Sequence, residues 1–401
     1  MFGYRWNQEK FGIGRGEKEA MASENFGKNE SEKISRRTFL KMLTGTAAGV
    51  AVTLALPTVS KAENVIENIN GQFDLEGGVT YIDSLGRRVT VASNIQKVIP
   101  AGMIAQTVLE MLCPEKLQYT TQELENENNR LLIKGTEPLL HISKKVNLHN
   151  SKLRNRLMNE LDESDGDLII DMGDLENISL DDYAEIQSGT GMPVLFLDAK
   201  VGNLSSSIIA LGKILNCKER AEEFSDFIDE VYDIFNHTNE SINSNINVLF
   251  AADAYGTANR PGYQYQNEVI RKLGYNPVVA LDKLDDEEIN IDKVIQMDVD
   301  FIFLSEWDTY NCILNKESSY YEIWEGVNAV KNGKYAVAPG IFHSWLGSAV
   351  LVQIIGIAWM AYIIEPSNYN FDMVQLTIKF YELFYNYVLT EEEAKKLIGI
   401  N

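Results

Sequence analysis

His343 is the side chain of this sequence whose type and setting point most directly to chemistry. It stands in the tetrapeptide Phe342-His343-Ser344-Trp345, between aromatic neighbours and shortly after an expected β-strand. A neutral imidazole can ligate a transition metal, and a ring N–H can donate a hydrogen bond to an oxyanion. A histidine that only serves the packing of the fold is an equally good interpretation.

Aromatic side chains near other expected strand ends would offer flat surfaces to a ligand. Tyr255, Tyr263 and Tyr265 follow the apolar run 247–251, and Trp307 follows the run 300–304. Rings of this kind can stack against a macrocycle or an aromatic chelate. Each of them could instead belong to a hydrophobic core, and the sequence leaves both alternatives open.

Short apolar runs bounded by turn residues predict the strands that position these side chains. Residues 97–99, 167–171 and 193–197 form a first set of runs, and apolar spacing predicts a helix over 103–112. Continuous apolar runs suit strands buried on both faces of a parallel sheet. Alternating β-formers around a glycine over 79–91 predict a hairpin ahead of this sheet.

A second set of strands follows a helical stretch. Apolar residues at steps of three and four predict one long helix over 204–236, or two helices with a break near Cys217. Further strands are expected at 247–251, 300–304 and 334–338, with a helix at 266–273. We therefore predict an α/β protein with an N-terminal lobe, residues 79–203, and a C-terminal lobe, residues 245–401.

Ligands of such α/β units bind outside the carboxyl ends of the strands. This rule selects the candidate residues of a ligand-binding cleft. In the N-terminal lobe they are Met103 and Asp174, with Asp198 close by; in the C-terminal lobe they are Tyr255, Tyr263, Trp307, His343 and Trp345.

The N-terminal region resembles a twin-arginine export signal. Arg36 and Arg37 precede the uncharged stretch 42–60, which ends in small residues. We assign residues 1–62 to this signal region and 63–78 to a flexible stretch, with translation starting at Met1 or at Met21. The protein is expected to leave the cytoplasm folded, through the twin-arginine translocase, and to be periplasmic or at the cell surface. Cleavage of the signal and retention of the signal as a membrane anchor are both open.

The charge balance argues against nucleic acid as a partner. The chain has 36 basic and 58 acidic side chains, of which the signal region holds 10 and 6, so that 26 and 52 remain. A protein with this excess of carboxylates repels phosphate groups. The three cysteines, Cys113, Cys217 and Cys312, fit neither a disulfide framework nor a zinc cluster, although one bridge is possible after export.

The C-terminal region is expected to be helical. Residues 348–364 lack charges but number only 17, which favours a buried helix over a membrane span. Residues 370–388 form an amphipathic pattern. Thr390 and Glu393 form a capping box for a last helix.

Several of these segments resemble the substrate-binding proteins of ABC importers for iron chelates (siderophores), haem or cobalamin. The opening segment Tyr81-Ile82-Asp83-Ser84-Leu85-Gly86-Arg87-Arg88-Val89-Thr90-Val91 is the most specific of them. Gly166-Asp167-Leu168-Ile169-Ile170, Asp298-Val299-Asp300-Phe301-Ile302 and Gly356-Ile357-Ala358-Trp359-Met360 follow in the order of the family. The resemblance covers most of residues 79–366.

The resemblance implies a class III substrate-binding protein, with two Rossmann-like lobes joined by one long helix, residues 204–236. It implies a receptor without catalytic residues or an intrinsic cofactor, which captures a metal chelate or metal macrocycle and delivers it to a permease and its ATPase. It also implies docking to the permease through acidic residues. Asp292 matches the position on the second lobe, whereas on the first lobe Asn159 stands where a glutamate is usual, with Glu160 beside it.

Other ligands and functions stay open at this point. Capture of a bare zinc or manganese ion needs several converging ligands, and only His141, His149, His237 and His343 are present. Molybdate or tungstate could bind through backbone amides, which a sequence does not reveal. An exported enzyme is the interpretation from a different class, but no nucleophile elbow, zinc-protease motif or phosphate-binding loop occurs.

Overall fold

A computed structural model gives the fold of this protein. The part of the chain that it describes comprises residues 72–73, 78–119, 148, 154–155, 158, 161, 163, 165–174, 179–236, 245–252, 264–278, 291–341, 343–347 and 349–399. The chain divides into two compact units, and every described element belongs to the unit that contains residues 62–401. The other unit, residues 8–61, lies outside the described residues, and so does the expected export signal.

The first elements that the structure describes form an antiparallel sheet of three strands. The strands are β1 (Gln72–Phe73), β2 (Gly78–Ile82) and β3 (Arg88–Ala92), in the order β1-β2-β3. The turn between β2 and β3 is built on Asp83, whose Oδ1 accepts hydrogen bonds from the amides of Leu85 (3.0 Å) and Arg87 (2.9 Å). Gly86 has φ +76°, a conformation that glycine adopts without strain. The predicted hairpin is confirmed.

A parallel sheet of three strands, in the order β4-β5-β6, forms the N-terminal α/β half. Its strands are β4 (Val98–Pro100), β5 (Leu168–Gly173) and β6 (Val194–Asp198). Its helices are α3 (Met103–Leu112), α6 (Leu180–Thr190) and α7 (Leu204–Ile214), with a short 3₁₀ helix, η2 (Pro114–Lys116), after α3. The three strands and α3 lie within two residues of the predicted bounds, whereas α6 and η2 were not predicted.

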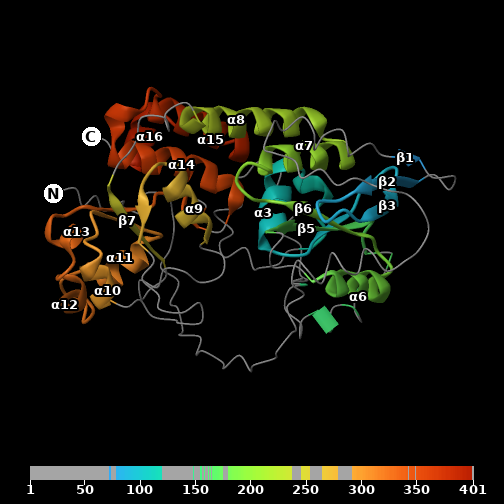
Figure 1. Ribbon diagram of the computed structural model, residues 1–401. Helices are drawn as coiled ribbons and strands as arrows, with labels where there is room; N and C mark the ends of the chain where they lie inside the picture. The colour runs from blue at the N-terminus through green and yellow to red at the C-terminus, as the bar shows by residue number, and fades with distance from the viewer. Residues whose placement is uncertain are drawn as a thin grey trace, which may run out of the picture. The chain divides into compact units, whose positions relative to one another are not determined.

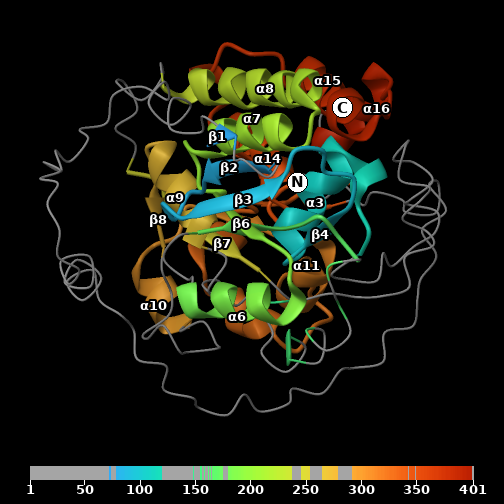
Figure 2. The ribbon, with the colours of Figure 1, turned by 90° about the vertical axis from the view of Figure 1, so that its right-hand side faces the viewer.

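The two faces of this sheet bury different sets of side chains. Leu168, Ile170 and Leu195 pack into one hydrophobic cluster with residues of α3 and α7. Ile169 and Phe196, which alternate with them, pack into another cluster with Tyr183 and Ile186 of α6. Figure 1 shows α6 and α7 on opposite sides of β5 and β6, and Figure 2 agrees. Burial on both faces explains why the strands are continuous apolar runs.

The β2–β3 turn occupies the outer edge of β6, where none of the described strands pairs. The amide of Ser84 donates to the carbonyl of Phe196 (3.0 Å), and the amide of Asp198 donates to Ser84 Oγ (3.0 Å). Arg87, which is paired with Asp83 at 2.5 Å, donates from Nη2 to the carbonyl of Val194 (2.9 Å). Unpaired strand edges invite association with other chains. The turn therefore covers the edge of β6. This is a structural role for the segment 81–91, which is the most specific part of the family resemblance.

The helical segment 204–236 is two helices, so the second of the two sequence alternatives is correct. α7 ends at Ile214 and α8 (Lys218–Asn236) begins after a break at which Asn216 has φ +55°. The two helices pack against each other, and a hydrogen bond of 2.7 Å joins Ser205 Oγ and Ser225 Oγ. α8 is the long helix that leads towards the second sheet.

The C-terminal half holds a parallel sheet of four strands in the order β10-β9-β7-β8. The strands are β7 (Asn247–Ala251), β8 (Asn276–Pro277), β9 (Phe301–Leu304) and β10 (Tyr335–Val337). The accompanying helices are α9 (Gln264–Lys272), α10 (Ile291–Gln296), α11 (Trp307–Ile313), α12 (Tyr321–Trp324) and α13 (Asn328–Lys331). The three strands predicted here are confirmed.

Three C-terminal helices complete a core that both halves share. They are α14 (Val350–Ile364), α15 (Met373–Tyr385) and α16 (Glu391–Ile398), with a 3₁₀ helix, η5 (Pro366–Asn368), between the first two. α14 contacts α3, α8 and α15, and its residues belong to a cluster that also contains Ile170 of β5 and Phe250 of β7. Within the described residues no helix has both the length and the apolar character that crossing a membrane requires. The capping box of Thr390 and Glu393 is present at α16.

Candidate ligand-binding site

The carboxyl ends of β4, β5 and β6 form the candidate edge of the N-terminal half. Gly102 is the N-cap of α3 and Met103, half-buried, is its first residue. As a glycine, Gly102 has no side chain that could cap the first amides of α3, and the first turn of the helix has no acidic residue. The amides at the start of this helix therefore lie directly after β4, where helix ends attract negative charge.

Asp174 and Lys200 connect the ends of β5 and β6. The Nζ of Lys200 lies 3.0 Å from Oδ1 of Asp174, and each side chain keeps about a third of its surface exposed. Asp198, in contrast, is buried and accepts hydrogen bonds from the amide of Lys200 (2.9 Å) and from Asn203 Nδ2 (2.7 Å). Asp198 thus holds the loop that leads to α7, while Asp174 and Lys200 stand at the surface of this edge. Lys200 was missed in the sequence, although it stands only three residues after the predicted strand 193–197.

The carboxyl ends of β9 and β10 form the candidate edge of the C-terminal half. Trp307, the first residue of α11, is half-buried, and its ring meets Tyr310 edge-on with centroids 5.1 Å apart. Ser344 Oγ donates a hydrogen bond of 2.5 Å to the carbonyl of Ser305, which directly follows β9. This contact ties the loop after β10 to the end of β9, so that the segments carrying Trp307 and His343 are joined.

His343 is half-buried beside α15. Its ring centroid lies 6.5 Å from that of Tyr385. Burial lowers the pKa of His343, which favours the neutral imidazole. A neutral imidazole is the form that ligates metals and that accepts a hydrogen bond at one nitrogen.

Trp345 lies in the core rather than at a surface that a ligand could reach. Its exposed fraction is 0%. Its Nε1 donates to the hydroxyl of Tyr381 (3.1 Å), and its ring meets Trp359 edge-on at 6.4 Å. These contacts account for the aromatic side chain without a ligand, and Trp345 has no place in the site that we propose below.

The other candidate residues divide into two groups. Asp292, in the first turn of α10, is exposed, as a docking residue must be. Tyr255, Tyr263, Glu160, Arg36 and Arg37 lie outside the described residues. Among the residues that the structure does describe, no group of three or more histidine, cysteine, aspartate or glutamate side chains could hold a metal ion.

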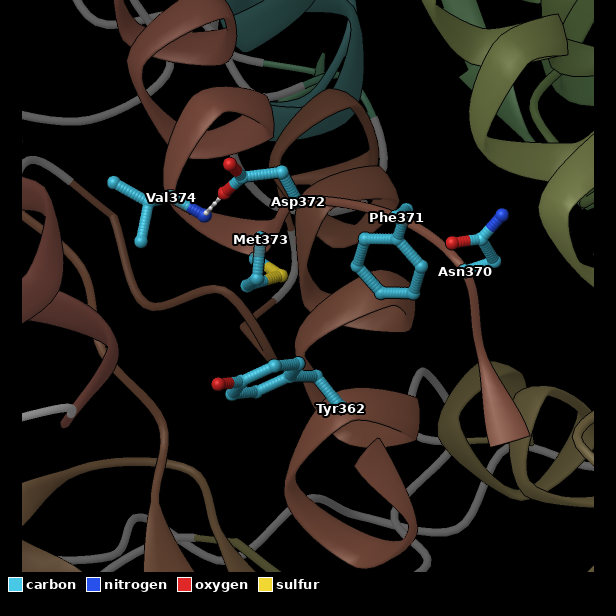
Figure 3. Close-up of a pocket in the computed structure, with 6 residues that line it drawn as sticks. All are labelled: Tyr362, Asn370, Phe371, Asp372, Met373 and Val374. Carbon is cyan, nitrogen blue, oxygen red and sulfur yellow. Dashed lines mark hydrogen bonds between the residues drawn. The ribbon is translucent and has the colours of Figure 1, made fainter. Parts of the chain in front are cut away.

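A hollow of about 480 Å³ lies between the end of α14 and the start of α15. Figure 3 shows Tyr362 facing the first residues of α15, where Asp372 Oδ1 accepts the amide hydrogen bond of Val374 (2.9 Å) as the N-cap. The hollow is lined by none of the candidate residues and lies away from the strand ends. The carboxylate of Asp372 is occupied in capping, so we assign this hollow no ligand.

Comparison with known proteins shows which proteins this chain resembles in sequence and in fold. Residues 165–341 match the family described as periplasmic binding protein. No curated protein sequence matches the chain. The matched family consists of binding proteins rather than enzymes, which confirms the prediction of a binding protein, and its description implies a periplasmic location.

Solved structures of solute-binding proteins share the fold. An ABC transporter solute-binding protein from Sulfurospirillum deleyianum has a TM-score of 0.64 and 17% identity, with 79% of this chain and 98% of that chain covered. The molybdate-bound periplasmic binding protein MolA of Haemophilus influenzae has a TM-score of 0.61 and 14% identity, with 78% and 99% covered. CeuE of Helicobacter pylori, with Ni(II) bound, has a TM-score of 0.58 and 15% identity, with 79% and 99% covered.

At 14% to 17% sequence identity, the similarity to these structures establishes the fold alone. This protein therefore has the fold of the solute-binding proteins of ABC transporters, and its residues 165–341 match the family described as periplasmic binding protein. The resemblance to substrate-binding proteins of ABC importers is therefore confirmed, without the identity of the solute. The three neighbours differ in what their structures contain, so the solute of this chain is a separate question.

Proposed function

We propose that this protein is the solute receptor of an ABC importer and that its solute is a metal complex of an organic chelator or macrocycle: an iron chelate, haem or a corrinoid. The observation that carries the proposal is the half-buried ring of Trp307 at the carboxyl end of β9. A ring in this position offers a flat apolar face at the edge where ligands of α/β sheets bind.

Two tyrosines continue the row of aromatic rings from Trp307 along α11 to the start of β10. Tyr310 meets Trp307 edge-on, and its ring centroid is 6.0 Å from that of Tyr335 in β10. Desolvation, followed by the nearby Tyr310 hydroxyl, raises the pKa of Tyr335, so the phenol of Tyr335 stays neutral. A neutral aromatic surface suits a macrocycle better than a small, strongly hydrated ion. His343 could add an axial ligand or a hydrogen bond to the same solute.

An oxyanion such as molybdate or tungstate is the second candidate. It is favoured by the start of α3, where the N-cap is a glycine without a side chain to cap the first amides and no carboxylate opposes an anion in the first turn. Lys200, beside Asp174, would add a positive charge at the same edge of the sheet. One structural neighbour, MolA of Haemophilus influenzae, is bound to molybdate.

Delivery would take place by docking to the permease of an importer driven by its ATPase. Asp292 supports this part of the proposal, because it is an exposed carboxylate in the first turn of α10. Exposed charges orient a partner more than they add to its affinity. The twin-arginine translocase would export the folded protein, and Arg36 and Arg37 would form the signal for it.

The deciding experiment measures thermal unfolding of the purified protein with ferric siderophores, haem, cobalamin, molybdate, tungstate and zinc. A ligand that binds only the folded state should stabilise the protein by roughly 3 to 4 kcal/mol at 100 to 1,000 times its Kd. Stabilisation by one chelate or macrocycle is the expected result. Stabilisation by molybdate or tungstate alone would show that the solute is an oxyanion rather than a metal complex, and the proposed role as a solute receptor would stand.

Trp307→Ala tests the site itself. We expect this variant to bind the stabilising chelate roughly 10- to 100-fold more weakly, because it removes an aromatic contact at the centre of the proposed surface. Tyr320→Ala is the matched control, since Tyr320 is an exposed aromatic residue that precedes α12 rather than following a strand. Equal affinity of wild type and Trp307→Ala in a titration followed by calorimetry would overturn the assignment of this surface.

A further inference from the structure

Two cysteines that are about 100 residues apart in the sequence meet in the fold. Cys113 is the C-cap of α3, and its amide donates to the carbonyl of Leu109 (2.9 Å). Cys217 lies in the break between α7 and α8, and its amide donates to the carbonyl of Gly212 (2.8 Å). Both are free thiols, and their side chains are hydrogen-bonded to each other.

An independent contact holds these two segments together. Arg220, in the first turn of α8, donates from Nε to the carbonyl of Met111 in α3 (2.8 Å). This hydrogen bond joins α8 to α3. Cys113 is two residues from Met111 and Cys217 is three residues from Arg220, so the bond holds the two thiols in neighbouring positions. The third cysteine, Cys312, packs against a different hydrophobic cluster in the C-terminal half.

We propose that Cys113 and Cys217 form a disulfide bond that fastens the end of α3 to the break between α7 and α8. Disulfides form and persist in oxidising compartments such as the periplasm, which the matched family implies for this chain. The proposal depends on that location and does not depend on which solute is bound.

The two thiols have different parts in the oxidation. Cys113 is buried, with 1% of its surface exposed, whereas Cys217 is half-buried and can be reached by a small oxidant. The hydrogen bond from Cys113 lowers the pKa of Cys217, and the nearby Arg220 acts in the same direction. The same pairing raises the pKa of Cys113, which keeps its proton until the second step. Cys217 is therefore the attacking thiol.

The oxidant in this reaction is a small-molecule disulfide such as oxidised glutathione. The thiolate of Cys217 attacks one sulfur of it, which forms a mixed disulfide and releases one glutathione as a thiolate that takes up a proton. Cys113 then loses its proton and attacks the sulfur of Cys217, which closes the Cys113–Cys217 bond and releases the second glutathione. Two cysteine thiols are oxidised, and one external disulfide is reduced to two thiols.

The test uses the full chain equilibrated with oxidised glutathione, digested without reduction and analysed by mass spectrometry. The expected result is one cross-linked peptide pair that contains Cys113 and Cys217, in wild type and in Cys312→Ala alike. A wild-type chain in which all three cysteines stay reduced, or in which the cross-link includes Cys312, would overturn the proposal.

Single variants test the division of roles. Cys113→Ala should accumulate one glutathione on Cys217, because the mixed disulfide has no second thiol to resolve it. Cys217→Ala should leave Cys113 unmodified, because that thiol is buried and keeps its proton. Glutathione on Cys113 in the Cys217→Ala variant would contradict the assigned order of attack.

The bond should also stabilise the fold, since it closes a loop of about 100 residues in the unfolded chain. We expect the midpoint of thermal unfolding of the oxidised protein to exceed that of the reduced protein by roughly 5 to 15 °C. Cys312→Ala should show the same difference and Cys113→Ala should show none. Equal midpoints of oxidised and reduced wild type would contradict the fastening of α3 to the helical break.

Discussion

Two tryptophans that look alike in the sequence, Trp307 and Trp345, have different positions in the structure. Both follow a strand of the second sheet, but Trp307 is half-buried at the end of β9 whereas Trp345 is enclosed by Tyr381 and Trp359. Their substitution should therefore affect different properties of the protein.

Trp345→Ala should reduce stability and leave ligand binding by the folded protein unchanged. Removal of a fully buried aromatic ring typically lowers the free energy of unfolding by about 3–5 kcal/mol. Denaturation by urea, followed by circular dichroism, measures this loss. Trp307→Ala should show the opposite pattern, with a small change in stability and a large change in affinity. A Trp345→Ala variant that is as stable as wild type but binds the ligand more weakly would show that Trp345 contributes to the ligand-binding site.

His343 should make the stability of the protein depend on pH. Burial holds its pKa below the ordinary value of 6.5, so the folded protein binds this proton only at lower pH than the unfolded chain does. Unfolding thus takes up a proton as the pH falls through 6.5 towards the lower pKa of the folded state. The contribution of the neutral histidine to stability is complete above this window and is lost within it.

His343→Gln should remove that dependence. Between about pH 7 and pH 5.5 the free energy of unfolding of wild type should fall more steeply than that of the variant, by at most about 1.4 kcal/mol per pH unit. Urea denaturation at several pH values measures both slopes, and the other three histidines are common to both proteins. Parallel slopes would contradict the burial of this imidazole in its neutral form.

At the scale of elements, the contact of α7 with α8 depends on a glycine. A Cβ atom at Gly212 would lie 2.2 Å from the Cβ of Ala221, and 3.3 Å from the carbonyl oxygen of Cys217. Helix propensity alone favours alanine over glycine by about 1 kcal/mol at a helix interior. The close approach of the two helices reverses this preference.

Gly212→Ala should therefore destabilise the protein by about 1–3 kcal/mol, the usual cost of overpacking. The double variant Gly212→Ala/Ala221→Gly moves the methyl group to the other helix and should recover part of the loss. Unfolding free energies of the two single variants and the double variant measure the coupling between the positions. A Gly212→Ala variant that is more stable than wild type would show that the helices do not approach so closely.

At the scale of the whole molecule, the described elements of both halves share one hydrophobic core. The faces of the two parallel sheets that carry Ile170 and Phe250 belong to the same cluster as α14 and α15. The opposite faces are covered separately, by α6 in one half and by the helices α10 to α13 in the other. The strand edges that carry the proposed ligand contacts are thus supported by a continuous layer of helices.

Docking to a permease would be a property of the surface of the molecule and should be separable from ligand binding. Asp292→Ala removes an exposed carboxylate of α10. We expect unchanged affinity for the solute and unchanged thermal stability, but reduced transport by the reconstituted importer, with a weaker dependence on salt concentration. Glu322→Ala, at an exposed carboxylate of α12, is the matched control. Full transport activity of Asp292→Ala would exclude this residue as a docking contact.

The sequence by itself determined the order and type of the elements that the structure describes. Strands buried on both faces are mostly apolar, so β5, β6, β7 and β9 could be predicted from their runs of apolar residues. The hairpin turn and the capping box of α16 were also predictable, because both depend on residues that are close in the chain. The family resemblance followed from such local segments in their order.

Only the tertiary structure decided which of these residues are buried and which segments meet. Trp345 and Trp307 differ because α14 and α15, which are distant in sequence from β9, cover one and not the other. The apolar periodicity of 204–236 continues through the helical break, and the positive φ of Asn216 and the packing of α7 on α8 distinguish two helices from one. The same packing brings Cys217 to Cys113. Contacts over such separations depend on how the elements fold back on each other, and no local pattern of residue types records them.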